Sequence, residues 1–207
     1  MDRCPRFFVN LRYMANKIYF IRHAPTKANL SGSMVKNYDA FDIEQFDTAL
    51  WYKNIGSRIK ISDNFEIWVS PTLRCKSTAM KLFGSLESKM REEPLLKELD
   101  CSSLGTKKFW EITKEEFDSI CKPDLEAFRN QIDSLIKKLK EKDKPIICIT
   151  HGLFTRYLYN YLTGQGDSEL YDLINSKTFQ FKNLDMMECT YDKDIKVNGV
   201  FHFDEYQ

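Results

Sequence analysis

Two short apolar runs, far apart in the chain, each end on a histidine, and this pairing constrains the fold more than any other feature. Residues 18–21 lead into Arg22 and His23, and residues 146–149 lead through a threonine into His151. Runs this short, rich in isoleucine and aromatic residues and followed by turn residues, are typical of buried strands. Open α/β sheets bind their ligands beyond the carboxyl ends of such strands. The sequence therefore predicts that an arginine and two histidines lie at the rim of a pocket.

A third segment, between these two, has the same organisation. The largely apolar residues 65–69 precede residues 70–79, which open a helix and carry Arg74 in its first turn. Amide donors at a helix N-terminus favour an anion, so the position of Arg74 adds to the expectation of an anion site. Strand-helix alternation of this kind is typical of a mostly parallel sheet with helices on both faces. We expect an α/β protein, a three-layer α/β/α sandwich with a mostly parallel central sheet.

Hydrophobic periodicity and turn residues predict the other elements. The clearest helix covers residues 124–141, where apolar side chains recur at helical spacing and lysines gather toward the end. The remaining expected elements are a short helix from Asp47 to near Gly56, a helix over residues 72–83 stopped by a left-handed Gly84, a short extended piece over residues 94–99, an irregular excursion over residues 100–112, a helix after His151 that ends at Gly164 and Gly166, and a strand pair over residues 186–203 that turns at residues 192–194.

Composition sets the class of the protein. The chain has 207 residues, of which 43% are hydrophobic, and this suffices for one well-filled core. We expect one domain over residues 14–207, preceded by a peripheral arm over residues 1–13. Thirty-one Lys and Arg against thirty Asp and Glu leave a formal net charge of +1, so no overall field favours nucleic acid or an anionic membrane.

The cysteines and the apolar runs indicate the compartment. The six cysteines include no Cys-x-x-Cys pair and follow no secretory leader, a pattern typical of reduced thiols inside a cell. No apolar run approaches the roughly 20 residues that a membrane-spanning helix needs. We therefore expect a soluble, cytoplasmic protein. Because no cluster has metal-ligand spacing and no Gly-rich phosphate loop is present, we expect neither a metal nor another cofactor.

The three strand-end segments, in this order, resemble the histidine phosphatase superfamily, also called the phosphoglycerate mutase-like family. The resemblance covers roughly residues 17–190. Residues 22–24, Arg-His-Ala, match the family's Arg-His-Gly/Ala signature, and Asn29, six positions after His23, matches its phosphate-binding asparagine. Arg74 matches the second arginine, and the His-Gly pair that begins at His151 matches the second histidine.

The resemblance implies a phosphoglycerate mutase-like fold and a phosphatase that hydrolyses phosphomonoesters without a metal. His23 would attack phosphorus as a neutral imidazole and form a phosphohistidine, with its other ring nitrogen held by a backbone carbonyl. The phosphate group would be bound by Arg22, Asn29, Arg74 and His151, and His151 would also take part in catalysis. Arginine suits this role because its guanidinium offers a fixed fork of donors.

The general acid is assigned from a Leu-x-Glu pattern, which Glu98 fits. This carboxyl would protonate the leaving oxygen and then activate the incoming water. The family commonly has a glycine a few residues further on, where this chain has Ser102, and this leaves Asp100 as a rival. Of the other candidates, we interpret His202 as structural and place Arg156 outside the site.

Two alternatives stay open at this point. One is a phosphoglycerate mutase, although Ala28 and residues 30–34 stand where the mutases carry aromatic residues around the motif asparagine. The other is a catalytically silent protein that binds phosphate for regulation, and such a protein would not need a nucleophile. The substrate is expected to be a small-molecule phosphomonoester, with phosphoproteins also open.

Overall fold

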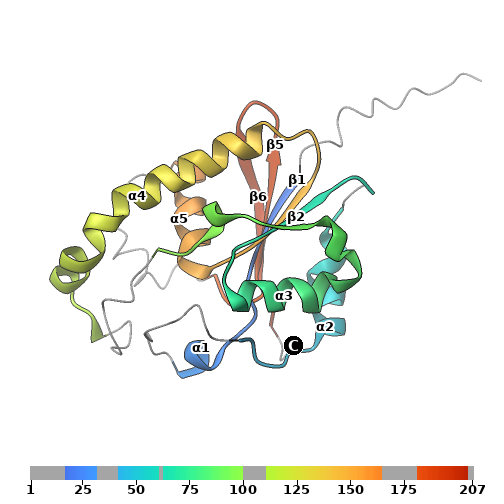
Figure 1. Cartoon of the computed structure of the whole chain (residues 1–207), viewed down its shortest axis with the longest axis horizontal. Coiled ribbons are helices and arrows are strands. Elements are labelled where there is room, and N and C mark those ends of the chain that lie inside the picture. The colour runs from blue at the N-terminus through green and yellow to red at the C-terminus, as the bar shows by residue number, and fades with distance from the viewer. Residues whose placement is uncertain (1–16, 32–41, 61–62, 100–110, 165–180, 205–207) are drawn as a thin grey trace, which may run out of the picture.

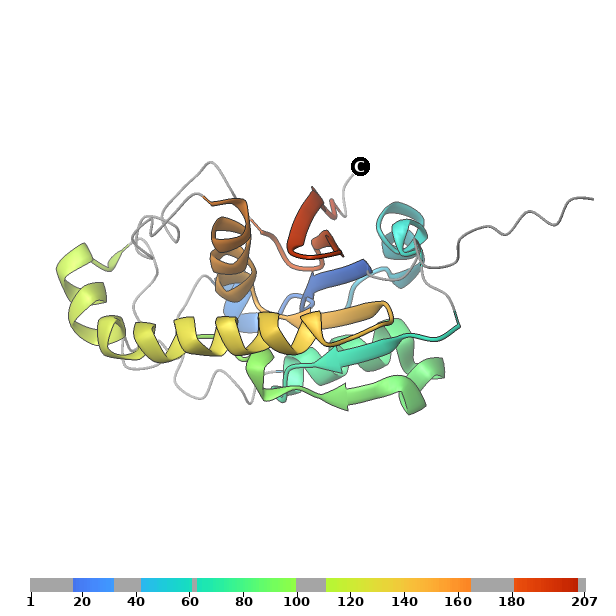
Figure 2. The same ribbon diagram turned by 90° about the horizontal axis from the view of Figure 1, so that it is seen from above.

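The computed structural model describes residues 17–31, 42–60, 63–99, 111–164 and 181–204. These residues form one six-stranded sheet with the strand order β3-β2-β4-β1-β5-β6. Figure 2 shows this order from the green and teal strands on one side, through orange and blue, to the red strands on the other. The four strands from β3 to β1 pair in parallel, whereas β5 pairs with β1 and β6 in antiparallel fashion. The strands are β1 (Lys17–Arg22), β2 (Glu66–Val69), β3 (Met90–Glu92), β4 (Ile146–Thr150), β5 (Met186–Tyr191) and β6 (Ile195–Phe201).

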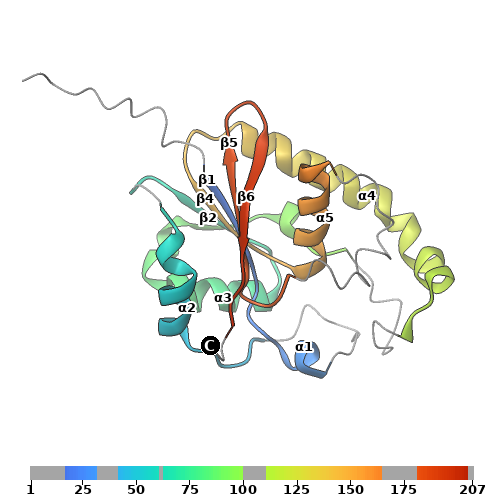
Figure 3. The ribbon, with the colours of Figure 1, turned by 180° about the vertical axis from the view of Figure 1, so that it is seen from behind.

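Helices cover both faces of the sheet, so the predicted α/β/α layering is confirmed (Figures 1 and 3). One face carries α4 and α5, and the other carries α2 and α3. The helices are α1 (Lys27–Ser31), α2 (Thr48–Asn54), α3 (Leu73–Phe83), α4 (Lys114–Lys140) and α5 (Gly152–Thr163), with short 3₁₀ helices η3 (Gly56–Arg58), η4 (Gly84–Lys89) and η5 (Pro94–Leu96). Among these, no described helix is long and apolar enough to cross a membrane.

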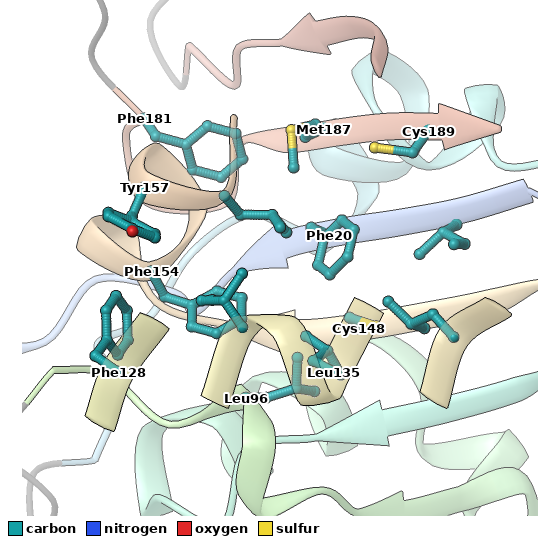
Figure 4. Packing of buried hydrophobic residues seen from close by; sticks show 14 of the residues in the cluster. Phe20, Leu96, Phe128, Leu135, Cys148, Phe154, Tyr157, Phe181, Met187 and Cys189 are labelled. Atoms are coloured by element: carbon teal, nitrogen blue, oxygen red, sulfur yellow. The ribbon is translucent and has the colours of Figure 1, made fainter. Parts of the chain in front are cut away.

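The core is divided by the sheet because successive strand side chains point to opposite faces. Phe20 of β1 packs with the α4 and α5 side, together with Cys148 and Met187 of neighbouring strands. Figure 4 shows these side chains facing Leu135 of α4 and Phe154 of α5. The residues of β1 on either side of Phe20, Tyr19 and Ile21, are buried on the α2 and α3 side. A central strand buried on both faces explains why the run is almost wholly apolar.

Strand register places the predicted functional residues together. Arg22 at the end of β1 pairs with Thr150 at the end of β4, and Val69 at the end of β2 pairs with Ile149. His23 and His151 are therefore the first residues beyond two adjacent parallel strands. The expectation that these strand ends meet at one edge of the sheet is confirmed.

Two local predictions were wrong. Gly84 has φ −56°, a right-handed conformation, because the chain continues directly into η4, whereas the left-handed cap is Gly164 with φ 68°. Residues 94–96 form a 3₁₀ helix and not an extended piece, since Pro94 suits the first helical turn and the Glu93 side chain accepts from an amide of that turn. The extended segment of this region is β3, which lies before Pro94 at one edge of the sheet.

The long helix α4 begins ten residues earlier than predicted, at Lys114 instead of Asp124. A capping box explains its start: the Thr113 hydroxyl accepts from the Glu116 amide, and the Glu116 carboxylate accepts from the Thr113 amide. The expected arm at residues 1–13, the irregular excursion at residues 100–110 and Gly166 lie outside the described residues.

Candidate active site

His23 is buried directly beyond β1 with its ring held in one orientation. Its amide donates to the Thr150 carbonyl at 2.9 Å, and its Nδ1 lies 2.7 Å from the Ala24 carbonyl oxygen. A carbonyl oxygen only accepts, so Nδ1 carries the proton and Nε2 carries the lone pair. Burial, and then the charges of Arg74 and Arg22, hold the pKa of His23 well below its usual range. His23 is therefore expected to be a neutral imidazole whose Nε2 is unprotonated.

His151 stands beside His23 with the opposite tautomer. The two ring centroids are 5.4 Å apart in an edge-on arrangement. Arg74 Nη2 donates to His151 Nδ1 at 2.9 Å, and because a guanidinium only donates, Nδ1 must be unprotonated. Nε2–H then donates to the Ser70 hydroxyl at 2.8 Å. Burial, followed by the Arg74 charge, keeps the pKa of His151 well below its usual range.

Ser70 was missed as a partner of the second histidine. It follows β2 directly, just as the two histidines follow β1 and β4, and this shared position was the available signal. The Cys75 thiol also contacts His151, with Sγ 3.6 Å from Nε2. Because burial raises the pKa of Cys75 to about 12, this thiol stays neutral and acts as packing.

The Arg22 guanidinium lies unusually close to the backbone of Gly152, the first residue of α5. Its Nη1 donates to the Phe181 carbonyl at 2.5 Å. A Cβ placed on Gly152 would lie 2.8 Å from the Arg22 guanidinium carbon, well inside van der Waals contact. Glycine at position 152 is therefore what lets the guanidinium occupy this place.

We predict that Gly152→Ala lowers kcat/KM by about tenfold or more, since small displacements of a substrate-binding group are costly in catalysis. Stability should change little, because the displaced atoms are the end of a flexible side chain. Gly164→Ala is the matched control: its left-handed φ of 68° makes alanine strained, but it lies at the far end of α5. Enzyme assays and thermal melts should give opposite patterns for the two variants, and unchanged turnover in Gly152→Ala would contradict the prediction.

Glu98 sits against the N-terminus of α5. Its Oε1 accepts from the Phe154 amide at 2.7 Å and its Oε2 from the Leu153 amide at 3.0 Å. Burial raises the pKa of Glu98, opposed by the Arg74 charge and by the two amides. A carboxyl group with a raised pKa next to the arginines can both donate and accept a proton. The rival acid, Asp100, lies outside the described residues.

Asn29 lies in α1, and its amide oxygen points toward the protein. Oδ1 accepts from the Thr26 amide at 3.2 Å, from the Thr26 hydroxyl at 3.1 Å and from Asn183 Nδ2 at 3.2 Å. Asn183 was missed, because nothing in a sequence links it to a residue 154 positions earlier. All six predicted site residues are thus described, five of them around the ends of β1, β2 and β4, with Asn29 tied to them through Asn183.

The structure also describes the two remaining candidates, His202 and Arg156. His202 Nδ1 is 2.7 Å from the carboxylate of the buried Asp185, which agrees with a structural role. Arg156 is partly buried on α5, and its pKa is lowered by burial and by the charge of Arg22, with Glu98 opposing. Arg156 is therefore closer to the site residues than the sequence analysis placed it.

The buried histidines predict how stability depends on pH. Above about 6.5, the usual imidazole pKa, both folded and unfolded chains are unprotonated, whereas below it the unfolded chain binds protons that the folded chain does not. Stability is therefore full above about pH 6.5 and is lost as pH falls, by up to about 1.4 kcal/mol per pH unit for each histidine.

The measurement is the thermal midpoint between pH 7.5 and 5.5 for the wild type and for His151→Asn. The variant should lose less stability on acidification than the wild type. This difference separates the contribution of His151 to stability from that of Glu98. The raised pKa of Glu98 makes stability fall as pH rises above 4.5, which is the opposite of the histidine effect. Parallel pH profiles for the two proteins would contradict the prediction.

The comparison with protein families identifies the chain. A model of the histidine phosphatase superfamily (branch 1) matches residues 18–194. The chain belongs to this superfamily. The match agrees with the resemblance predicted from the strand-end motifs. By contrast, no curated protein matches the chain in sequence.

Solved structures of phosphatases and mutases share the fold of this superfamily member. Phosphoserine phosphatase from Entamoeba histolytica, in complex with 3-phosphoglyceric acid, superposes with a TM-score of 0.65 at 19% identity over 92% of this chain and 99% of that chain. Phosphoglycerate mutase from Thermus thermophilus gives 0.63 at 16% identity over 91% and 99%. Mycobacterial glucosyl-3-phosphoglycerate phosphatase gives 0.60 at 14% identity over 92% and 99%. At identities this low, the similarity shows a shared phosphoglycerate mutase-like fold and nothing about the substrate.

Proposed function

We propose that the protein is a metal-independent phosphomonoester hydrolase that works through a phosphohistidine on His23. The observation that carries the proposal is the hydrogen bond from His23 Nδ1 to the Ala24 carbonyl at 2.7 Å. This bond places the lone pair on Nε2, and the lowered pKa keeps the ring neutral. A neutral imidazole with a fixed, unprotonated nitrogen is the nucleophile that phosphoryl transfer to histidine requires.

Positive charge at the site supports phosphate as the ligand. Arg22 and Arg74 both lower the pKa of His23, so their charges act on this ring. Two guanidinium groups offer forked donors to the phosphoryl oxygens and can stabilise the charge that spreads over them in the transition state. In this proposal they supply the charge that a metal ion supplies in other phosphatases.

The first half of the reaction needs a proton donor for the leaving oxygen, and the second half needs a base for the attacking water; we assign both roles to Glu98. Its raised pKa favours the protonated form that can supply a proton to the leaving oxygen. The resulting carboxylate is then stabilised by the Leu153 and Phe154 amides and can take a proton from the attacking water. We place His151 beside the transferring group, because its ring centroid lies 5.4 Å from that of His23.

We expect Glu98→Gln to slow alkyl phosphates by about 10²-fold or more while slowing aryl phosphates far less, because an aryl leaving oxygen needs little protonation. The measurement compares kcat/KM for a pair of such substrates in both proteins. Asp100→Asn serves as the control and should treat the two substrates alike. The opposite pattern would move the acid to residue 100.

A phosphate-release screen over a panel of phosphorylated metabolites and phosphopeptides tests the proposal, with His23→Ala as the negative control. Release should persist in the presence of a chelator and be inhibited by vanadate, which mimics a pentacoordinate phosphorus. The panel should include 3-phosphoglycerate. Interconversion of 3- and 2-phosphoglycerate faster than phosphate release would favour a mutase, and loss of turnover on chelation with recovery on adding metal would overturn the metal-independent route.

A further inference from the structure

Residues 181–185, which precede β5, form hydrogen bonds with the residues at the end of β1. Four of its hydrogen bonds reach back about 160 positions in the chain and meet Arg22 or His23. They are the bond from Arg22 Nη1 to the Phe181 carbonyl (2.5 Å), from the Leu184 amide to the Arg22 carbonyl (3.1 Å), from the Arg22 amide to the Asp185 carbonyl (3.1 Å) and from Asn183 Nδ2 to the His23 carbonyl (2.9 Å).

Asn183 uses both hydrogens of its amide nitrogen on this site. One is donated to the His23 carbonyl at 2.9 Å and the other to Asn29 Oδ1 at 3.2 Å. A side-chain amide has two N–H donors, so the nitrogen of Asn183 is fully engaged by these two residues. A single side chain thus connects the predicted nucleophile to the predicted phosphate-binding asparagine.

The orientation of the Asn29 amide follows from its partners. The Thr26 backbone N–H can only donate, and it lies 3.2 Å from Asn29 Oδ1. If the amide were turned over, Nδ2 would meet donors from both Thr26 and Asn183. Oxygen is therefore the atom that faces Thr26 and Asn183, and the amide nitrogen of Asn29 lies on the other side of the group.

We propose that Asn183 is a positioning residue for phosphate binding, which acts by fixing the amide of Asn29 with its N–H donors toward the substrate. The inference rests on the proposed function for its substrate, a phosphoryl group. Without Asn183, one of the three donors to Asn29 Oδ1 is lost. Oδ1 keeps its two Thr26 donors but is held less firmly, so the N–H donors of Asn29 are less well aligned with the phosphate.

A double-mutant cycle tests whether Asn183 acts through Asn29. Asn183→Ala and Asn29→Ala should each lower kcat/KM, and weaken binding of inorganic phosphate in calorimetry, by about tenfold, as expected for a hydrogen bond to a charged ligand. In the Asn29→Ala background, Asn183→Ala should cost less than about threefold, because its target is already absent. Additive effects would overturn the inference.

Two further variants separate this inference from folding and from the proposed function. Asn183→Asp keeps the size of the side chain but replaces its N–H donors with acceptors, so it should impair phosphate binding at least as much as Asn183→Ala. If the alanine variant does not fold, the aspartate variant replaces it in the cycle. Asn198→Ala removes an asparagine of β6 that hydrogen-bonds to Thr190 and Glu188 of β5, and it should leave both readouts unchanged. A wild type that binds phosphate but hydrolyses nothing would refute the proposed function, while the calorimetric cycle would still decide the role of Asn183.

Discussion

Replacing His23 with alanine is expected to lower kcat/KM for any phosphomonoester substrate by at least about 10⁴-fold, because it removes the group that accepts the phosphoryl in the proposed mechanism. His23 is buried and its hydrogen bonds hold it in one tautomer, so no water molecule in its place would have the same basicity and position. The fold should persist, since within the described part of the chain the imidazole hydrogen-bonds only to the carbonyl of the next residue.

His23→Asn is the control for packing, because it keeps a donor near the Ala24 carbonyl but has no nucleophilic nitrogen. Both variants should be equally inactive, with thermal midpoints close to that of the wild type. Phosphate release by either variant within tenfold of the wild-type rate would refute the nucleophile assignment.

Arg74→Ala is expected to lower kcat/KM by about 10²-fold or more, since a charge-assisted donor in a desolvated site contributes most in the transition state. The variant also removes the donor to His151 Nδ1, so the tautomer of that ring is no longer fixed. Because Arg74 is a buried cation near a second one, Arg22, its removal should cost little stability.

Arg74→Lys separates charge from geometry. Lysine keeps the positive charge but lacks the planar fork, so it should recover only part of the lost activity. Arg91→Ala is a matched control, because this arginine pairs with Glu66 and Glu93 and packs over Trp68. It should reduce the thermal midpoint without changing kcat/KM. A large loss of stability with normal turnover in Arg74→Ala would instead assign Arg74 a structural role.

Sequence patterns predicted the parts of the fold whose signals are local. The strands ending at Arg22, Val69 and Thr150 are short runs buried on both faces, so their composition alone distinguishes them. Their parallel pairing follows from the intervening helices, and this is why the meeting of His23, Arg74 and His151 could be expected before any coordinates.

The contacts that complete the site depend on topology and could not be predicted. Asn183 and Phe181 reach the end of β1 only because β5 pairs with β1 in antiparallel fashion, with Ile21 opposite Met186. The position of Glu98 on the amides of α5 likewise depends on a turn whose type was predicted wrongly. Residues 94–96 coil into a 3₁₀ helix because Pro94 and the Glu93 side chain complete a helical first turn.

The most direct test of the proposed mechanism is to trap the phosphoenzyme. The wild-type protein is mixed briefly with an active phosphomonoester, denatured in alkali, digested and analysed by mass spectrometry. We expect phosphate on the peptide that contains residue 23, attached to histidine, stable in alkali and lost in acid, and absent from His23→Ala. Rapid turnover with phosphate on a different residue, or with none on the protein at any reaction time, would contradict catalysis through His23.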